Sequence, residues 1–180
     1  MAWTDAYDPH FCVAGKKYGI KKLILKSVAI IESSLRPDAY RFEPAFWDSY
    51  LKDKPEWNKY DPRLVSASYG LCQIMLPVAV ELGLTEGGDM AKVAESLKDP
   101  LINITLCAKL LRKHIDKATE KRYGDKFYWL SNLQVGLARY NGGGFKNPDE
   151  NGDLRNNKYV RKVMRQWGEL RQVERECDNG

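Results

Sequence analysis

The sequence lacks the features that mark several large classes of protein. No apolar run approaches the roughly 18 residues that a membrane span needs, which excludes an integral membrane protein. The first ten residues contain no basic segment followed by an apolar stretch, so no signal peptide is visible. Only two of the 180 residues are histidine and no CxxC pair occurs, so a zinc site has neither its ligands nor their spacing. We expect no metal and no cofactor.

The remaining composition is that of a globular protein. Hydrophobic residues make up 43% of the chain, aromatic residues 11% and charged residues 29%. The aromatic content and the scattered charges argue against disorder. A chain of this length suits one domain that buries a sufficient core without needing disulfide or metal cross-links. We therefore expect a compact, soluble single domain over residues 1–180, and a monomer.

The four cysteines are widely spaced and permit three pairings. Without a visible signal peptide, we expect free and mostly buried thiols, and nothing local supports a nucleophilic Cys/His pair. These residues are Cys12, Cys72, Cys107 and Cys177.

The net charge of +5 is concentrated near the C-terminus. A helix over 158–174 would place an apolar stripe on one face and most basic residues on the opposite face. That face is either simply solvated or attracted to a polyanion, nucleic acid or an anionic cell wall, and charge alone does not choose. No nucleic-acid-binding motif is present, so we expect no nucleic-acid partner.

The hydrophobic pattern predicts helices nearly throughout the chain. No long alternating pattern occurs, although the irregular excursion after residue 51 could hide a small hairpin, between Pro55 and Ser68. The fold class is therefore mainly α. The first predicted helix is short and begins at Asp8. The others cover 21–33, 44–51, 77–82, 90–97, 100–121, 125–140 and 158–174.

Glu32 does not fit its surroundings, because it ends the most apolar predicted helix. Partial desolvation disfavours the charged form of a carboxylate and raises its pKa. A carboxylic acid that stays protonated near neutral pH is what a general acid in glycosidic cleavage requires. The alternative is a helix-end glutamate that reaches solvent or pairs with Arg36 or Arg41.

Three further segments place amide side chains near predicted helix ends, and two of them, 68–75 and 140–144, add glycine and tyrosine. They are residues 68–75, 99–103 and 140–144. Such side chains suit a neutral polyhydroxylated or acetamido ligand, through hydrogen bonds and contacts with ring faces. Taken singly, each has a structural explanation as turn glycines, a capping asparagine or a core tyrosine.

In their order along the chain, these motifs resemble the soluble lytic transglycosylase (SLT) domain, a family of peptidoglycan-cleaving enzymes with a goose-type lysozyme-like fold. The resemblance covers about residues 21–163, and the segment Arg41–Trp47 is similar to an insertion in a phage-associated branch. The motifs are Glu32-Ser33, Gly70-Leu71-Cys72-Gln73-Ile74, Asp99-Pro100…Asn103-Ile104 and Ala138-Arg139-Tyr140-Asn141-Gly142-Gly143.

The resemblance implies a role for each matching residue. Glu32 matches the single catalytic acid/base and Ser33 the serine beside it. Gln73 matches the substrate-cleft glutamine, and Tyr140 and Asn141 match the Tyr-Asn pair that contacts the substrate. Two departures stand out: Cys72 replaces the usual methionine, and Arg139 replaces a small residue.

The implied activity is cleavage of the β-1,4 bond between N-acetylmuramic acid and N-acetylglucosamine in peptidoglycan, with a 1,6-anhydro product. The site of action would be the bacterial cell wall, without membrane insertion. A hydrolytic lysozyme of the same fold would need a second carboxylate, for which Glu43 is the candidate. Glu43 has its own alternatives, an ion pair with Arg41 or a charge at a helix start. A non-catalytic wall-binding module is the remaining possibility.

Overall fold

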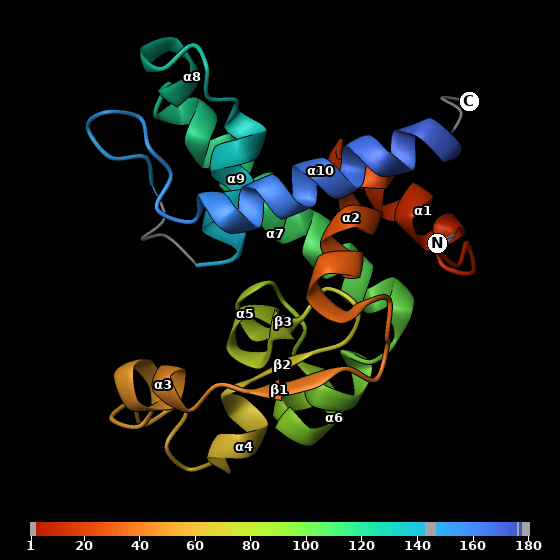
Figure 1. Cartoon of the computed structure of the whole chain (residues 1–180). Helices are drawn as coiled ribbons and strands as arrows, with labels where there is room; N and C mark the ends of the chain where they lie inside the picture. The colour runs from red at the N-terminus through yellow and green to blue at the C-terminus, as the bar shows by residue number, and fades with distance from the viewer. Residues whose placement is uncertain (1–2, 143–146, 176, 178–180) are drawn as a thin grey trace. The chain divides into compact units, whose positions relative to one another are not determined.

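The computed structural model describes residues 3–142, 147–175 and 177. The chain is mainly helical, as predicted, with one small sheet (Figure 1). It divides into two compact units, residues 1–11 with 28–107 and residues 12–27 with 108–180. The elements in chain order are α1 (Asp8–Tyr18), α2 (Lys22–Ser33), β1 (Tyr40–Phe42), α3 (Pro44–Phe46), the π-helical turn η1 (Trp47–Leu51), α4 (Pro62–Val65), β2 (Ala67–Tyr69), β3 (Ile74–Met75), α5 (Leu76–Glu81), the 3-10 turn η2 (Glu86–Gly88), α6 (Met90–Ser96), α7 (Pro100–Glu120), α8 (Tyr123–Lys126), α9 (Asn132–Tyr140) and α10 (Asn157–Val173).

The sheet belongs to the first unit and is antiparallel, in the order β1-β2-β3. Tyr40 pairs with Tyr69, and Tyr69 pairs with Ile74. The hairpin is therefore not where we predicted it. Residues 55–66 form turns and α4, and only the last two residues of the predicted segment, Ala67 and Ser68, lie in a strand. Strands of two or three residues are too short to produce a readable alternation, which explains the misplacement.

The predicted helices are present, with one correction. The helix predicted over 125–140 is interrupted, because α8 ends at Lys126 and α9 begins only at Asn132. Ser131 starts α9 with a capping box, in which its hydroxyl accepts the Gln134 N–H and Gln134 Oε1 accepts the Ser131 N–H. This reciprocal capping satisfies two N–H groups and favours a fresh helix start there.

Each unit has its own apolar core. In the first unit the buried side chains come from the end of α2, the sheet and its turn, α6 and the start of α7; examples are Val28, Leu71, Leu76, Val93, Leu97 and Ile104. In the second unit they come from the start of α2, α7, α9 and α10; examples are Leu23, Leu25, Leu111, Val135, Leu137 and Val163. The most apolar of the predicted helices, α2, is thus buried along most of its length.

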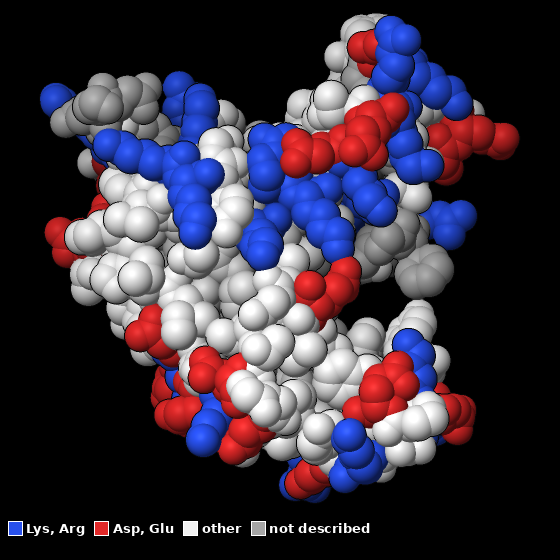
Figure 2. Space-filling view, turned by 180° about the vertical axis from the view of Figure 1, so that it is seen from behind, with Lys and Arg blue, Asp and Glu red and all other residues white. Residues whose placement is uncertain are grey.

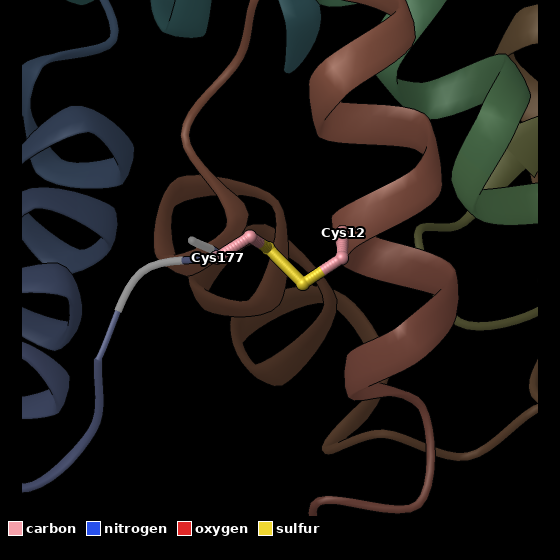
Figure 3. The surroundings of a disulfide bond; sticks show 2 residues. All are labelled: Cys12 and Cys177. Carbon is pink, nitrogen blue, oxygen red and sulfur yellow. A yellow bond between two sulfur atoms is a disulfide. The ribbon is translucent and has the colours of Figure 1, made fainter. Parts of the chain in front are cut away.

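The prediction that all four cysteines are free is wrong for two of them. Cys12 and Cys177, both in the second unit, form a disulfide across 165 residues (Figure 3). Their Cα atoms are 5.8 Å apart, within the range that a disulfide spans. Sequence spacing could not show this, because only the fold brings α1 and the C-terminal segment together. Cys72 and Cys107 are buried thiols, as predicted.

An ion pair joins the same C-terminal segment to α2. The Lys26 ammonium is fully buried and lies 2.8 Å from both carboxylate oxygens of Glu174. Because both Glu174 oxygens accept from the Lys26 ammonium, this buried charge has hydrogen-bond partners where water does not reach it. The segment is therefore held within the second unit by an ion pair and a covalent bond.

The charges divide unevenly between the units. The second unit carries 21 Lys and Arg against 10 Asp and Glu, a net charge of +11, and the first carries 8 against 14, a net charge of −6. Figure 2 shows Lys and Arg side chains gathered over part of one face. Among the helices of the described residues, none has the length and apolar character needed to cross a bilayer.

Candidate active site

The end of α2 holds the candidate acid. Glu32 is half-buried, and the helix stops one residue later through two successive residues in the left-handed region, Ser34 (φ 57°) and Leu35 (φ 61°). The Leu35 N–H donates to the Ala29 carbonyl oxygen at 3.4 Å, and the Ser34 N–H donates to that of Ile30 at 2.9 Å. A bulky residue rarely adopts positive φ, and such conformations cluster at functional sites.

Ser33 joins this helix end to the segment Gly70–Gln73. Its hydroxyl is buried and donates to the Leu71 carbonyl oxygen at 2.7 Å. The Ser33 hydroxyl oxygen in turn accepts the Arg36 N–H at 3.1 Å. Ser33 therefore holds the turn after β2 against the end of the helix that carries Glu32.

Asn103, near the start of α7, fixes the other side of this turn. Its Oδ1 accepts the Cys72 N–H at 2.8 Å, while its Nδ2 donates to the carbonyl oxygens of Tyr69 at 2.9 Å and Leu97 at 2.8 Å. The residue is 0% exposed. One buried amide thus makes three hydrogen bonds to backbone groups on and beside this turn.

Gly70 is required by this close packing. A Cβ atom there would lie 2.3 Å from the Leu97 carbonyl oxygen and 2.4 Å from Asn103 Nδ2, and φ is +74°. Only glycine combines this conformation with this approach.

Cys72 lies in the electrostatic field of Glu32. Burial raises the pKa of the Cys72 thiol well above its ordinary value, with further contributions from its hydrogen bond with Cys107 and from the charges of Cys107 and Glu32. The Cys72 thiol therefore stays protonated and forms part of the surroundings of the candidate acid. The family methionine would bring a larger side chain to this place.

Gln73 has an unusual backbone for its residue type, with φ 50°. Its Nε2 donates to the carbonyl oxygens of Ala39 at 3.2 Å and Gly70 at 3.1 Å. Within the described residues, its Oε1 makes no hydrogen bond and remains an available acceptor.

Glu43 follows β1 and precedes α3 in the first unit. Its carboxylate pairs with Arg41 Nε at 2.5 Å, which is one of the two alternatives stated for it. Its backbone is also fixed, since its N–H donates to Ser66 O and its carbonyl accepts the Ser66 hydroxyl.

Tyr140 and Asn141 lie in the second unit, at the end of α9. Tyr140 is half-buried, and Asn141 is the C-cap and accepts a hydrogen bond from Asn156 Nδ2. Arg139, which stands where the family has a small residue, is buried, and its Nη1 donates to Asn147 Oδ1 at 2.5 Å. Gly143, the last residue of this motif, and Gly144 after it lie outside the described residues.

The structure thus brings Glu32, Ser33 and Gln73 into one hydrogen-bonded region of the first unit. Sequence reasoning missed the role of Asn103, which it treated only as part of a helix start. A signal was available, because asparagine is a poor helix former and stands beside the buried Ile104. No comparable signal in the sequence indicated the hydrogen bond between the Cys72 and Cys107 thiols. Within the described residues, no cluster of three or more His, Cys, Asp or Glu side chains could hold a metal ion.

A mainly helical fold with a small antiparallel sheet, and a carboxylic acid at the end of its most apolar helix, are consistent with the lysozyme-like class. The chain matches the Transglycosylase SLT domain family over residues 10–163, and it belongs to that family. Members are generally lytic transglycosylases, so membership implies a peptidoglycan-cleaving transglycosylase activity. No curated protein and no solved structure matched the chain.

Proposed function

We propose that the protein is a lytic transglycosylase that cleaves the β-1,4 bond between N-acetylmuramic acid and N-acetylglucosamine, with Glu32 as its single acid/base. The observation that carries this proposal is the position of Glu32. It is half-buried at the end of α2, close enough for its charge to raise the pKa of the buried Cys72 thiol, and beside a turn held by Ser33 and Asn103. Family membership supplies the substrate class.

In the proposed mechanism, the Glu32 carboxylic acid gives its proton to the glycosidic oxygen as the bond to the anomeric carbon breaks. The substrate's acetamido group stabilises the positive charge that develops, as in substrate-assisted glycosidases. The Glu32 carboxylate then removes the proton of the C6 hydroxyl, whose oxygen attacks the anomeric carbon. The product is a 1,6-anhydro sugar, and no water is consumed.

The remaining residues are assigned supporting roles. We assign Gln73 to substrate binding through its available Oε1, and Tyr140 and Asn141 to contacts with the sugar. Ser33 acts as a positioning residue, because its hydroxyl is already engaged by backbone groups. The resemblance also places Ser33 among the substrate-binding residues, next to the bond that Glu32 cleaves.

We further propose that the enzyme acts at the bacterial cell wall. The Cys12–Cys177 disulfide supports an oxidising compartment, since disulfides persist outside the cytosol. The segment Arg41–Trp47, which forms the end of β1, α3 and the first residue of η1, supports assignment to the phage-associated branch.

The test is mass spectrometry of the sugars released from purified peptidoglycan. We expect products with 1,6-anhydro ends, one water lighter than hydrolysis products, and their loss in Glu32→Gln. Glu95→Gln is the matched control, because Glu95 is an exposed glutamate on α6 whose carboxylate pairs with Lys98. Reducing ends would instead identify hydrolysis, and Glu43→Gln would then test the second carboxylate. Wall binding without any cleavage would leave only a binding module.

A further inference from the structure

Arg139 is a buried charge in α9, directly before Tyr140 and Asn141. It is 6% exposed, and its Nη1 donates to Asn147 Oδ1 at 2.5 Å. Its Nε is also buried and has no hydrogen-bond partner among the described residues. No carboxylate in that part of the chain pairs with it. A guanidinium is always charged, so one neutral acceptor offsets only part of the cost of burying it.

Stability alone does not explain this charge. The C-terminal end of a helix favours a cation, and Arg139 lies in the last turn of α9. An apolar side chain of similar size would nevertheless avoid the desolvation altogether, and so would the small residue that the SLT resemblance leads us to expect here. What the guanidinium adds is a directed hydrogen bond to a residue eight positions away, outside the helix.

The loop 147–156 that receives this bond is tied to the end of α9 at both of its ends. Asn147, its first residue, accepts from Arg139, and Asn156, its last, donates from Nδ2 to Asn141 Oδ1. The middle of the loop is held by a β-bridge and by a carboxylate that accepts two N–H groups; the residues are Pro148 with Leu154, and Asp149 with Asn151 and Asp153. Tyr140 therefore stands between two residues whose side chains are fixed to the same loop.

We propose that Arg139 is a positioning residue for the reaction. By holding Asn147, it fixes the loop 147–156 to the end of α9 and thereby sets where Tyr140 and Asn141 meet the sugar. The inference rests on the proposed function, because it takes these two residues as substrate contacts. Arg139 is itself buried and acts only through its hydrogen bond. Its loss should affect the transition state more than substrate binding, because small displacements cost most where alignment is most demanding.

Arg139→Met separates this role from a purely structural one. Methionine keeps a long side chain without the charge, and replacing a buried charge by an apolar group is often neutral or stabilising. We therefore expect a melting temperature at or above that of wild type. On soluble glycan strands, kcat should nevertheless fall about tenfold while KM changes less than about twofold. Arg139→Lys, which keeps a donor, should recover part of kcat.

Two further variants test whether Arg139 acts through Asn147. Asn147→Ala should lower kcat by a similar factor, and the double variant with Arg139→Met should lower it no further, because both remove one contact. Arg165→Met is the matched control, since it makes the same substitution at an exposed arginine on α10. Its kcat should equal that of wild type.

A second measurement does not depend on cleavage. In NMR spectra of the ¹⁵N-labelled full-length chain, the side-chain amide signals of Asn141 and Asn156 report on the tie at the far end of the loop. The loss of each signal in Asn141→Asp or Asn156→Asp assigns it. Both signals should shift in Arg139→Met and stay in place in Arg165→Met.

The outcomes separate this inference from the proposed function. Wild-type kcat in Arg139→Met, additive losses in the double variant, or unmoved amide signals would each overturn the positioning role alone. A fall in kcat that merely follows a loss of folded protein would overturn it as well. Absence of cleavage by wild type would instead overturn the proposed function, and the amide signals would still show whether Arg139 holds the end of α9.

Discussion

Replacement of Asn103 by alanine tests whether the candidate site depends on one buried amide. The substitution removes three hydrogen bonds, to the Cys72 N–H and to the carbonyl oxygens of Tyr69 and Leu97. Asn103 is fully buried, so water cannot replace the lost partners without rearrangement. At about 1 kcal/mol for each bond, and more where a buried group is left unsatisfied, the free energy of unfolding should fall by at least about 3 kcal/mol.

That loss is large compared with the 5–15 kcal/mol typical of a whole domain. Urea unfolding followed by circular dichroism measures it, with Asn58→Ala as the control. Asn58 is exposed and its side chain makes no hydrogen bond with the described residues, so its replacement should stay within about 0.5 kcal/mol of wild type. Under conditions where Asn103→Ala remains folded, peptidoglycan cleavage should also drop, because the turn that carries Gln73 loses its clamp.

The reasoning is refuted if Asn103→Ala lies within about 1 kcal/mol of wild type, because hydrogen bonds of this number and burial cannot then be contributing as described. If Asn103→Ala is less stable but cleaves peptidoglycan at the wild-type rate at a temperature where it is folded, only the predicted loss of activity is refuted. In that case the turn after β2 would not position the reacting groups.

Cys12→Ser should lower the free energy of unfolding by about 5 kcal/mol on the chain-entropy relation for a loop of 165 residues; equal melting temperatures for oxidised and reduced wild type would contradict this. Gly70→Ala should cost more than about 2 kcal/mol in urea unfolding, because its Cβ would meet Leu97 and Asn103, whereas Gly83→Ala, with open space around it, should cost less. Burial, with smaller contributions from Tyr40 and Asp61, raises the pKa of Tyr69 from 10.0 to about 12. The folded state therefore keeps a proton that the unfolded state releases, so the stability of wild type relative to Tyr69→Phe should hold below pH 10 and decline between pH 10 and 12; a constant difference across that range would argue against it.

The helical content and the position of Glu32 were open to prediction because each depends on a local pattern. Apolar residues at helical spacing identified α2, and an ionisable residue at its end was conspicuous for that reason. The break between α8 and α9 was missed, since the aromatic residues 127–129 fit a helical pattern as well as a loop. The Ser131 capping box, which makes α9 begin at Asn132, depends on a hydrogen bond that composition does not reveal.

The order of the motifs along the chain was enough to show a resemblance to the SLT domain, and that resemblance indicated a helical, peptidoglycan-cleaving domain. Helix patterns and motif order can be read from the sequence because they are properties of neighbouring residues. The hydrogen bonds from Asn103 to the turn after β2 and the disulfide from Cys12 to Cys177 could be seen only in the folded chain. Each joins residues that are distant in sequence, and their approach is set by how the helices pack. A linear pattern carries no information about that packing.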